Sequence, residues 1–384
     1  MRRSQNQKAD DSKMTDASHL VLRGIRKTYG DECVLNGVSL DVREGEYVVI
    51  LGPSGCGKST LLQIIAGLVR ADSGSVELSS RSLDRTSPND RDVSILFQDD
   101  RLYPHWTLRQ SLQVACDRSP VKAKVDGLLD QIAERLGIGL QLDRRPDEVS
   151  GGQLRRAALA KALLRQPAVC LLDEPLTAID TMLREELVSL LADYPRSRGD
   201  SLSRTSIVHV THDGDEAMRL ADRIVVMGQG RVLQSDAPEL VYRKPKTLGV
   251  AKALGTPPAN FLPLRWVQAT VPGQAESIVN AVSCKGDDSV LVVRPESAQW
   301  LTAELERATP GAALEFEAQI VSSRYVGGRY VIQVSPLADG GTRLTLFSHG
   351  EIAATGEPGL VRIPFSELAC VPAQENAPEA SESR

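Results

Sequence analysis

The stretch that decides the fold reads Gly52-Pro-Ser-Gly-Cys-Gly-Lys-Ser-Thr60 and fits the pattern G-x-x-x-x-G-K-[ST]. An apolar run, Tyr47–Leu51, leads into it, and a helical pattern, Lys58–Ala66, follows, with Gly67 as the expected stop. Glycines let the backbone curl so that successive N–H groups point at phosphate oxygens, and the helix N-terminus adds partial positive charge. The segment therefore predicts a nucleotide site between a strand and a helix.

The side chains of this loop have distinct expected roles. Lys58 supplies a mobile cation for the β- and γ-phosphates, and Ser59 offers a hydroxyl to Mg²⁺. Cys56 is either an inert small residue or a redox-sensitive thiol. The residues expected at the nucleotide are Gly52, Pro53, Ser54, Gly55, Cys56, Gly57, Lys58, Ser59 and Thr60.

Two adjacent carboxylates follow a second apolar run. Ala168–Leu172 has the pattern of a buried strand, and Asp173 and Glu174 come directly after it. A carboxylate at the end of a neighbouring strand holds Mg²⁺ in sites of this kind, so Asp173 is the expected metal ligand beside Ser59. Glu174 can then polarise an attacking water as general base. Strand ends often carry Asp for structural reasons, so this interpretation depends on the phosphate loop.

The composition bounds the class of protein. The chain has 384 residues, 41% of them hydrophobic and 25% charged, and a formal net charge of −5. This length allows two domains, and the charge balance argues against a protein built mainly to bind nucleic acid. No run approaches the roughly 18–20 apolar residues of a membrane-spanning helix, and the polar N-terminus lacks the apolar core of a signal peptide. The six cysteines are scattered, which predicts reduced thiols of a cytosolic protein rather than disulfides or a zinc site.

The pattern changes once along the chain. Residues 1–18 and 372–384 are polar and predicted to be disordered. Over 19–255, short β-branched runs alternate with helical patterns, which predicts an α/β domain with a mostly parallel sheet. Over 256–371, strand-like pieces separated by Gly and Pro predict a small β-barrel. The Pro-rich seam 255–259 is the expected boundary.

A second glycine-rich motif resembles one family. Val149-Ser-Gly-Gly-Gln153 precedes a helical pattern, Gln153–Arg165, and resembles the signature of the ABC ATPases. The resemblance implies a P-loop NTPase domain with a helical subdomain, ATP as the nucleotide, and Mg²⁺. It also implies a head-to-tail homodimer in which this motif grips the γ-phosphate bound to the opposite subunit. The implied signature residues are Ser150, Gly151, Gly152 and Gln153.

Four further positions resemble family elements and occur in the family's order. Tyr29 resembles the aromatic residue that stacks on adenine, and Gln98 resembles the glutamine that contacts Mg²⁺ and links the site to a permease. Asp180 resembles the loop that crosses between subunits, and His212 resembles the histidine that senses the γ-phosphate. The resemblance thus implies catalytic roles for Glu174, His212 and Gln98. Taken singly, Tyr29 could be packing, Gln98 solvated, and His212 a cap of the following helix.

The sequence departs from the family pattern in three places. Val149 stands where the signature usually has Leu, and Ile179 stands where Leu usually precedes Asp180. Both replacements are apolar and of similar size, so packing should be preserved. The segment 195–204 is more polar than the family's usual turn there, which puts the end of the preceding helix in doubt.

The second half of the chain resembles one branch of the family. Val293-Arg-Pro-Glu296, the strand–Gly-Gly–strand pattern Gln319–Val334 and the run Pro257–Leu262 resemble the C-terminal regulatory domain of importer ATPases, the TOBE domain. A generic small barrel is the alternative. Barrels of this type can bind nucleic acid through aromatic residues and a basic groove, but few aromatics and no basic stripe occur here. We therefore expect a regulatory, dimer-contacting module and no nucleic acid.

A short aromatic segment, Leu102-Tyr-Pro-His-Trp-Thr107, also resembles the importer class. Exposed aromatics there would form a docking surface for the permease. The alternative is a loop at the start of a helix with Trp106 buried.

These observations predict an ATP-binding and hydrolysing subunit of an ABC importer, peripheral on the cytoplasmic face of the membrane. Its expected partners are transmembrane permease subunits and, indirectly, a solute-binding protein. The aromatic segment and the C-terminal domain favour a sugar as cargo, but importers of iron, sulfate, polyamines and molybdate share the layout. The main alternative is a soluble ABC ATPase of repair or translation. Such proteins typically carry a long coiled-coil insertion or two cassettes, and this sequence shows neither.

Overall fold

The computed structural model describes residues 18–97, 102–117, 127–177, 179, 181–194, 205–282, 284, 286, 288–302, 312–339, 341–348 and 355–373. The chain divides into two compact units, Met1–Pro238 and Glu239–Arg384. Gln98, Asp180, the segment 195–204 and nearly all of both predicted disordered ends lie outside the described residues. Ser18 and Pro372, at the inner limits of those ends, instead belong to strands because they pair with Arg43 and Ser289.

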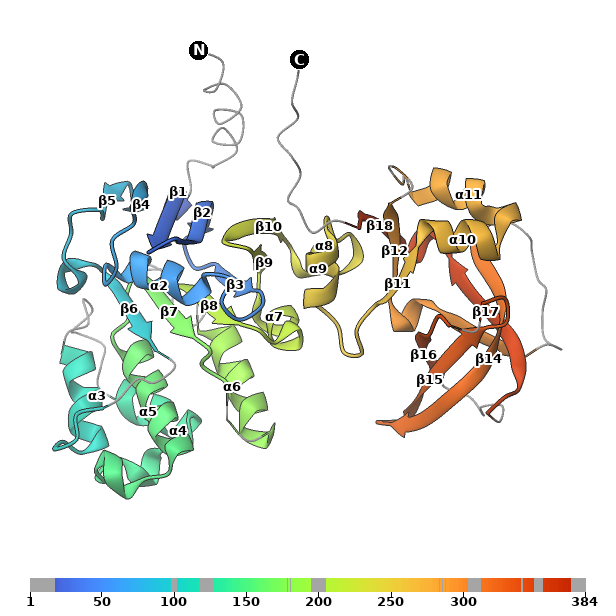
Figure 1. The fold of residues 1–384 in the computed structure, drawn as a ribbon. Helices are drawn as coiled ribbons and strands as arrows, with labels where there is room; N and C mark the ends of the chain where they lie inside the picture. Colours follow the sequence, from blue (N-terminus) through green and yellow to red (C-terminus); the bar gives the residue numbers. More distant parts are fainter. Residues whose placement is uncertain are drawn as a thin grey trace, which may run out of the picture. The chain divides into compact units, whose positions relative to one another are not determined.

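The first unit is built on a sheet whose described strands are β3 (Tyr47–Leu51), β6 (Val93–Leu96), β7 (Val169–Asp173), β8 (Ser206–Thr211), β9 (Arg223–Gly228) and β10 (Arg231–Asp236). Their order is β10-β9-β3-β8-β7-β6, and all are parallel except β10 (Figure 1). β3, β7 and β8 are buried along their whole length, as interior strands of a parallel sheet should be. Their carboxyl ends share one edge, which is where such sheets place their ligands.

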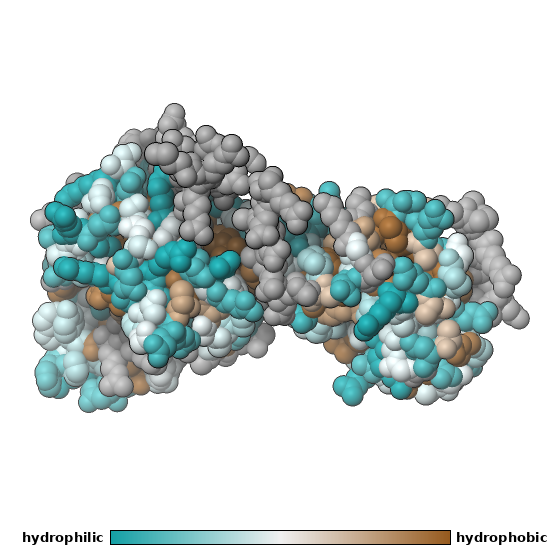
Figure 2. Space-filling model, turned by 45° about the horizontal axis from the view of Figure 1, so that its top comes forward, coloured by the Kyte–Doolittle hydropathy of each residue, from teal (hydrophilic) through white to brown (hydrophobic). Residues whose placement is uncertain are grey.

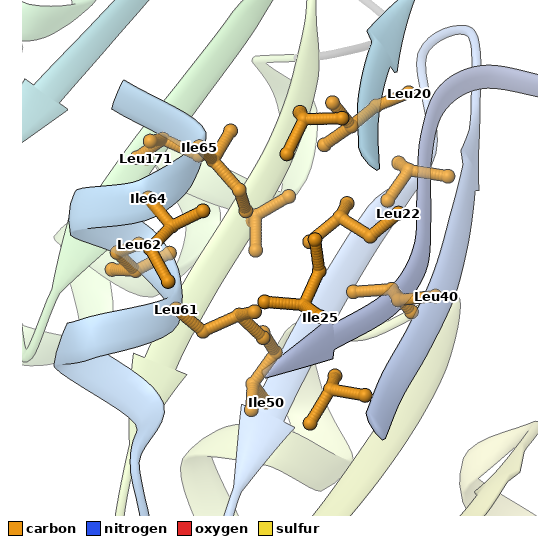
Figure 3. Packing of buried hydrophobic residues seen from close by; sticks show 14 of the residues in the cluster. Leu20, Leu22, Ile25, Leu40, Ile50, Leu61, Leu62, Ile64, Ile65 and Leu171 are labelled. Atoms are coloured by element: carbon orange, nitrogen blue, oxygen red, sulfur yellow. The ribbon is translucent and has the colours of Figure 1, made fainter. Parts of the chain in front are cut away.

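A smaller antiparallel sheet completes the core of this unit. Its order is β2-β1-β4-β5, with β1 (Ser18–Tyr29), β2 (Glu32–Arg43), β4 (Ser73–Leu78) and β5 (Arg81–Ser82). Helix α2 (Lys58–Ala66) contributes Leu61 and Ile65 to one hydrophobic core with Leu22 and Ile25 of β1 (Figure 3). Each such side chain contributes about 1.5–3 kcal/mol when fully buried. This packing fixes the start of α2 against the sheets.

The remaining described helices of the first unit include a separate helical group. They are α3 (Leu108–Asp117), α4 (Leu128–Arg135), α5 (Gly151–Leu164), α6 (Thr181–Asp193) and α7 (Gly214–Leu220), with short 3-10 turns η1 (Pro88–Asp90), η3 (Gly139–Gln141) and η4 (Pro146–Glu148). α3 and α4 pack on α5 and on each other (Figure 1). Helices α3, α4 and α5 therefore form the predicted helical subdomain.

The second unit is rich in antiparallel strands. Its described elements, from the helix that spans the division onward, are α8 (Pro238–Arg243), α9 (Leu248–Ala253), β11 (Asn260–Pro263), α10 (Leu264–Thr270), α11 (Pro272–Val282), β12 (Ser289–Val293), η5 (Pro295–Ser297), β13 (Gln299–Thr302), β14 (Ala313–Val326), β15 (Arg329–Pro336), β16 (Leu344–Ser348), β17 (Pro358–Pro364), η6 (Phe365–Glu367) and β18 (Leu368–Pro372). The strands form sheets of order β11-β12-β18 and β13-β17-β14-β15-β16 around one hydrophobic core, a barrel-like arrangement. The helices α10 and α11 were not expected from the sequence. They pack beside these sheets, and Ile278 of α11 is buried in the shared core.

The division between the units falls before the seam expected at 255–259. The structure groups the chain from Glu239 onward with the second unit. Arg294, after β12, explains this grouping because its buried guanidinium donates hydrogen bonds to the carbonyl oxygens of Tyr242, Ala251 and Leu254. It also lies 4.0 Å from the centre of the Tyr242 ring. The segment carrying α8 and α9 is therefore fastened to the second unit.

The expectation that all cysteines are reduced thiols is wrong for one pair. Cys284, after α11, and Cys370, on β18, form a disulfide across a sequence separation of 86 residues. Their Cα atoms are 5.6 Å apart, within the range for a disulfide, because α11 packs against β18. Cys33, Cys56, Cys116 and Cys170 are free. No cluster of three or more His, Cys, Asp or Glu side chains that could hold a metal occurs in the described part of the chain.

Candidate active site

The phosphate loop joins β3 to α2 as predicted. Its backbone requires glycine at Gly57, where φ is +102° and an added Cβ would lie 2.7 Å from both Val34 O and Leu35 Cδ2. Gly52 is equally confined, because a Cβ there would lie 2.3 Å from Met227 O. Gly57 is also the N-cap of α2, and no described side chain caps this helix. The first N–H groups of α2 therefore remain directed into the loop for an anion.

Lys58 is buried within this loop. Its Nζ donates hydrogen bonds to the carbonyl oxygens of Gly52 at 2.7 Å and Pro53 at 2.9 Å. Cys56 Sγ is 4.0 Å from the same Nζ. Burial raises the pKa of the Cys56 thiol, and this effect outweighs the opposing charge of Lys58. The thiol is thus protonated at neutral pH, which favours the inert alternative over the redox-sensitive one.

Ser59 and Asp173 meet across the start of α2 and the end of β7. Ser59 Oγ donates to Asp173 Oδ1 at 3.2 Å. Burial raises the pKa of the Asp173 carboxyl, and the neighbouring Glu174 adds to this, while Ser59 and Lys58 oppose it. A partly desolvated carboxylate beside a hydroxyl supplies the hard oxygen donors that Mg²⁺ takes, so these residues fit that ion.

Glu174 is held from several sides. Its φ is +49°, and its N–H donates to Val210 O at 2.9 Å while Arg155 of α5 donates to its carbonyl oxygen. Its carboxylate accepts a hydrogen bond from Thr177 Oγ1 at 3.2 Å. His212 Nδ1 lies 2.9 Å from the other carboxylate oxygen, Oε1. A left-handed conformation costs a non-glycine residue about 1–3 kcal/mol, and such strain is common at functional sites.

His212 follows β8 and points to Glu174 rather than capping the next helix. Asp213 is the N-cap of α7, and its Oδ1 accepts hydrogen bonds from the backbone N–H groups of Asp215 and Glu216. The alternative that His212 is a helix cap is therefore wrong. The structure thus brings His212 and Glu174 into contact, although they belong to separate motifs in the sequence.

The signature residues begin helix α5. Ser150 is the N-cap, its Oγ accepts from Gln153 N at 3.3 Å, and Gln153 Oε1 accepts from Ser150 N at 2.9 Å. Nothing lies within 4 Å of a Cβ built at Gly151 or Gly152. The capping hydrogen bonds of this turn are therefore made between its own residues, Ser150 and Gln153.

Tyr29 and the aromatic segment are exposed. The Tyr29 side chain, at the end of β1, is 48% exposed, so it does not serve core packing. Tyr103 is 45% and Trp106 38% exposed, and their ring centres are 4.5 Å apart. The alternative with Trp106 buried is wrong, because Leu102 takes the buried position instead.

Two predicted site residues, Gln98 and Asp180, lie outside the described residues, so their roles stay predictions. Thr177 and Arg155, which hold Glu174, were missed by the sequence analysis. Threonine is common in turns and arginine is common on helices. The only sequence signal for a role was their position just after the motifs 149–153 and 173–174.

The described helices include none that is both long and apolar enough to cross a membrane. On the face drawn in Figure 2, hydrophilic side chains cover most of the described surface, and hydrophobic ones form small separate patches.

Comparison with known proteins places the site in a family. The model of the family described as ABC transporter matches residues 35–177, which run from β2 past Glu174. A solved ATP-binding cassette, MJ0796 in a dimeric post-hydrolysis state bound to ADP and Pi, is similar with a TM-score of 0.50 and 27% identity. The similarity covers 57% of this chain and 98% of that one.

Similar curated proteins extend the match over both units. An sn-glycerol-3-phosphate import ATP-binding protein UgpC of Rhodopseudomonas palustris is 36% identical over 364 residues, covering 92% of this chain and 93% of the relative. A protein of the same description from Rhizobium etli, UgpC 3, is 39% identical over 290 residues, covering 74% of this chain and 82% of the relative. These relatives support import rather than repair or translation. The chain therefore belongs to the ABC transporter family, as an ATP-binding, ATP-hydrolysing subunit of the import type.

Proposed function

We propose that this subunit drives the uptake of a small phosphorylated polyol or a related sugar through a separate membrane permease. The observation that carries the catalytic part is the contact between His212 and Glu174, next to the Ser59–Asp173 pair and the phosphate loop. The cargo class is supported by the relatives, whose names describe sn-glycerol-3-phosphate import. This choice narrows the sugar preference drawn from the sequence.

ATP is positioned by groups that the first unit supplies. The N–H groups at the start of α2 and the ammonium of Lys58 bind its phosphates, and Tyr29 stacks on the adenine. Lys58 already lies in the loop, where two carbonyl oxygens hold it, so little side-chain reordering is needed when it turns to a phosphate.

Ser59 and Asp173 would hold Mg²⁺, with Gln98 as a further ligand. The ion would neutralise charge on the β- and γ-phosphates. Asp173 carries out its part as a carboxylate, and the raised pKa caused by burial would fall once a cation stands beside it.

Glu174 acts as general base. It accepts a proton from water as the water oxygen bonds to the γ-phosphorus, the bond to the bridging oxygen breaks, and ADP and inorganic phosphate form. His212 holds one oxygen of the carboxylate and Thr177 the other, which leaves the base little freedom to turn away.

The active form is a head-to-tail homodimer. In it, the signature turn of one copy binds the γ-phosphate held by the other copy, and Asp180 lies in the loop that crosses between them. The dimeric state of the similar cassette supports this arrangement. Closure around two ATP molecules would then transmit movement to the permease.

The permease docks on the first unit from the membrane side, which makes the protein peripheral on the cytoplasmic face. Tyr103 and Trp106 supply exposed aromatic surface. A cavity of about 220 Å³ adjoins it, because Lys161 lines this cavity and also lies 5.8 Å from the Tyr103 ring centre. Leu68, half exposed, is on the same lining. A solute-binding protein takes part indirectly, on the far side of the membrane.

Glu174→Gln tests the catalytic assignment. The change keeps the shape and removes the base, so we expect turnover to fall at least about 100-fold while ATP still binds. The control is Glu186→Gln, an exposed carboxylate on α6, which should turn over like wild type. Turnover of Glu174→Gln near wild type would disprove the assignment.

The same variant tests the transport assignment. Tagged Glu174→Gln protein, captured from its own cells in mild detergent with ATP, should bring down polytopic permease subunits and a solute-binding protein. Uptake of sn-glycerol-3-phosphate by the assembled complex, measured against a neutral disaccharide, then tests the cargo class. Capture of only soluble or nucleic-acid-associated partners would contradict import.

A further inference from the structure

A polar network lies beneath the turn that carries His212. Tyr47 at the start of β3, His209 on β8 and Glu216 on α7 are all buried. Tyr47 Oη is 2.9 Å from His209 Nδ1, and His209 Nε2 is 2.8 Å from Glu216 Oε1. The network therefore links the strand before the phosphate loop to the helix that follows His212.

Arg184 of α6 joins this network to the turn. Its Nη2 lies 2.5 Å from Asp213 Oδ2 and 3.1 Å from Glu216 Oε2, so one nitrogen bridges two carboxylates. Burial raises the pKa of Glu216, but His209 and Arg184 outweigh it and hold that pKa below its ordinary value. The pKa of Asp213 is likewise lowered against burial, by backbone N–H groups and Arg184. Both carboxylates are thus charged partners of Arg184 at neutral pH.

The two bridged carboxylates hold His212 from both sides in sequence. Asp213 caps α7 with its other oxygen and donates its N–H to Thr211 Oγ1 at 3.0 Å. Thr211 Oγ1 in turn donates to Glu216 Oε2 at 3.3 Å. Arg184 therefore holds Asp213, which follows His212, directly, and it holds Thr211, which precedes His212, through Glu216. His212 itself has a largely exposed side chain and, among its described contacts, the Glu174 carboxylate.

We propose that Arg184 is a positioning residue for ATP hydrolysis, which clamps Asp213 and Glu216 and thereby holds His212 against Glu174. This rests on the proposed roles of Glu174 and His212. A misplacement of about 1 Å at a reacting group can cost about 100-fold in rate, so loss of the clamp should lower turnover strongly. Nucleotide binding should change little, because Arg184 has no described contact with the phosphate loop or Tyr29.

Arg184→Met tests the proposal against a matched control. Arg219→Met removes another ion pair between the same two helices, the exposed Arg219–Glu185 pair, whose described hydrogen bonds and ion pairs do not include Asp213 or Glu216. We expect kcat to fall roughly tenfold or more in Arg184→Met, with KM for ATP within about twofold of wild type. Arg219→Met should keep wild-type kcat and KM. Equal kcat values in the two variants would overturn the proposal.

A background lacking His212 separates positioning from general loss of structure. In His212→Ala, the further change Arg184→Met should no longer lower kcat, because the residue that it positions is gone. A fall of the same size in both backgrounds would show a merely structural role and overturn the proposal. Wild-type turnover by His212→Ala alone would instead disprove the proposed role of His212.

A second variant keeps the test decisive if Arg184→Met fails to fold. Asp213→Asn retains an oxygen that can cap α7 but loses the charge that Arg184 contacts. It should reproduce a kcat loss with unchanged KM, also absent in the His212→Ala background. Wild-type kcat in a folded Asp213→Asn protein would overturn the proposal.

Discussion

Helices α2 and α5 both begin at glycine-rich turns, yet their starts differ. At α2 the N-cap is Gly57 and no described side chain occupies the first N–H groups. At α5, Ser150 and Gln153 bond reciprocally, so the helix caps itself. The phosphate loop is therefore prepared for an anion within one chain. At the signature turn the N–H of Gln153 is already bonded to Ser150 Oγ, so fewer of the first N–H groups are left for a ligand.

The glycines of the two turns also differ in whether their own chain leaves room for a side chain. Gly57 is required by its own chain, because φ is positive and a Cβ would collide with Val34 and Leu35. Gly151 and Gly152 have open space around a Cβ and no such backbone constraint. The described part of the chain therefore gives no reason for glycine at these two positions, whereas the proposed dimer would give one, because a nucleotide carried by a second copy would approach them.

The largest effect should follow from Lys58→Ala. Removing the cation from a turn prepared for phosphate should weaken ATP binding by about 30-fold or more, since truncating a charge in a desolvated ion pair costs about 2–5 kcal/mol. Titration with a fluorescent ATP analogue measures this, and Lys252→Ala on α9 is the control. Binding within threefold of wild type would show that the α2 turn is not the main phosphate site.

Gly151→Ala should separate the two turns. The residue is helical and its Cβ has room, so stability should stay equal or rise by about 0.5–1 kcal/mol. ATP binding to the single chain should be unchanged, whereas turnover should fall at least about tenfold because, in the proposed dimer, the Cβ would obstruct the nucleotide of the second copy. Urea denaturation, ATP titration and phosphate release measure the three quantities.

The matched substitution Gly57→Ala should behave in the opposite way. Strain at positive φ and the contacts with Val34 O and Leu35 should lower stability by about 2 kcal/mol. If Gly151→Ala lowered stability as much as Gly57→Ala, the contrast between the turns would be wrong.

The sequence predicts the phosphate loop almost residue by residue because local rules decide it. The pattern of Gly, Lys and Ser, the preceding apolar run and the stop at Gly67 all act within one segment. The parallel sheet followed from alternation along the chain. Asp173 and Glu174 were placed correctly at the end of β7 for the same reason.

What the sequence could not supply depends on distant pairs. The disulfide joins cysteines 86 residues apart, and no spacing rule identifies such a pair. Helix α11 begins with Pro-Gly, a pair that by local rules indicates a break between strands. Arg184 looks like an ordinary charge on a helix until the fold brings Asp213 and Glu216 to it. Contacts of this kind join residues that are distant in the sequence, so local sequence patterns do not predict them.

The smallest expected effect concerns the turn at Asp339, whose hydrogen bonds should not change when ATP binds. Asp339, after β15, accepts hydrogen bonds from Thr342 N and Oγ1 and from Gly341 N, which lower its pKa to about 2. A lowered pKa stabilises the fold above the ordinary value near 4, and the contribution is lost as the pH falls through about 2. Wild type should thus be more stable than Asp339→Asn at pH 7, and the difference should shrink between pH 4 and pH 2. Urea denaturation followed by tryptophan fluorescence measures it, since Trp266 also donates to Asp339. ATP should leave the difference unchanged, because Asp339 lies in the second unit and the proposed phosphate-binding groups belong to the first. A difference that ATP abolished would contradict the assignment of nucleotide binding to the α2 and α5 turns.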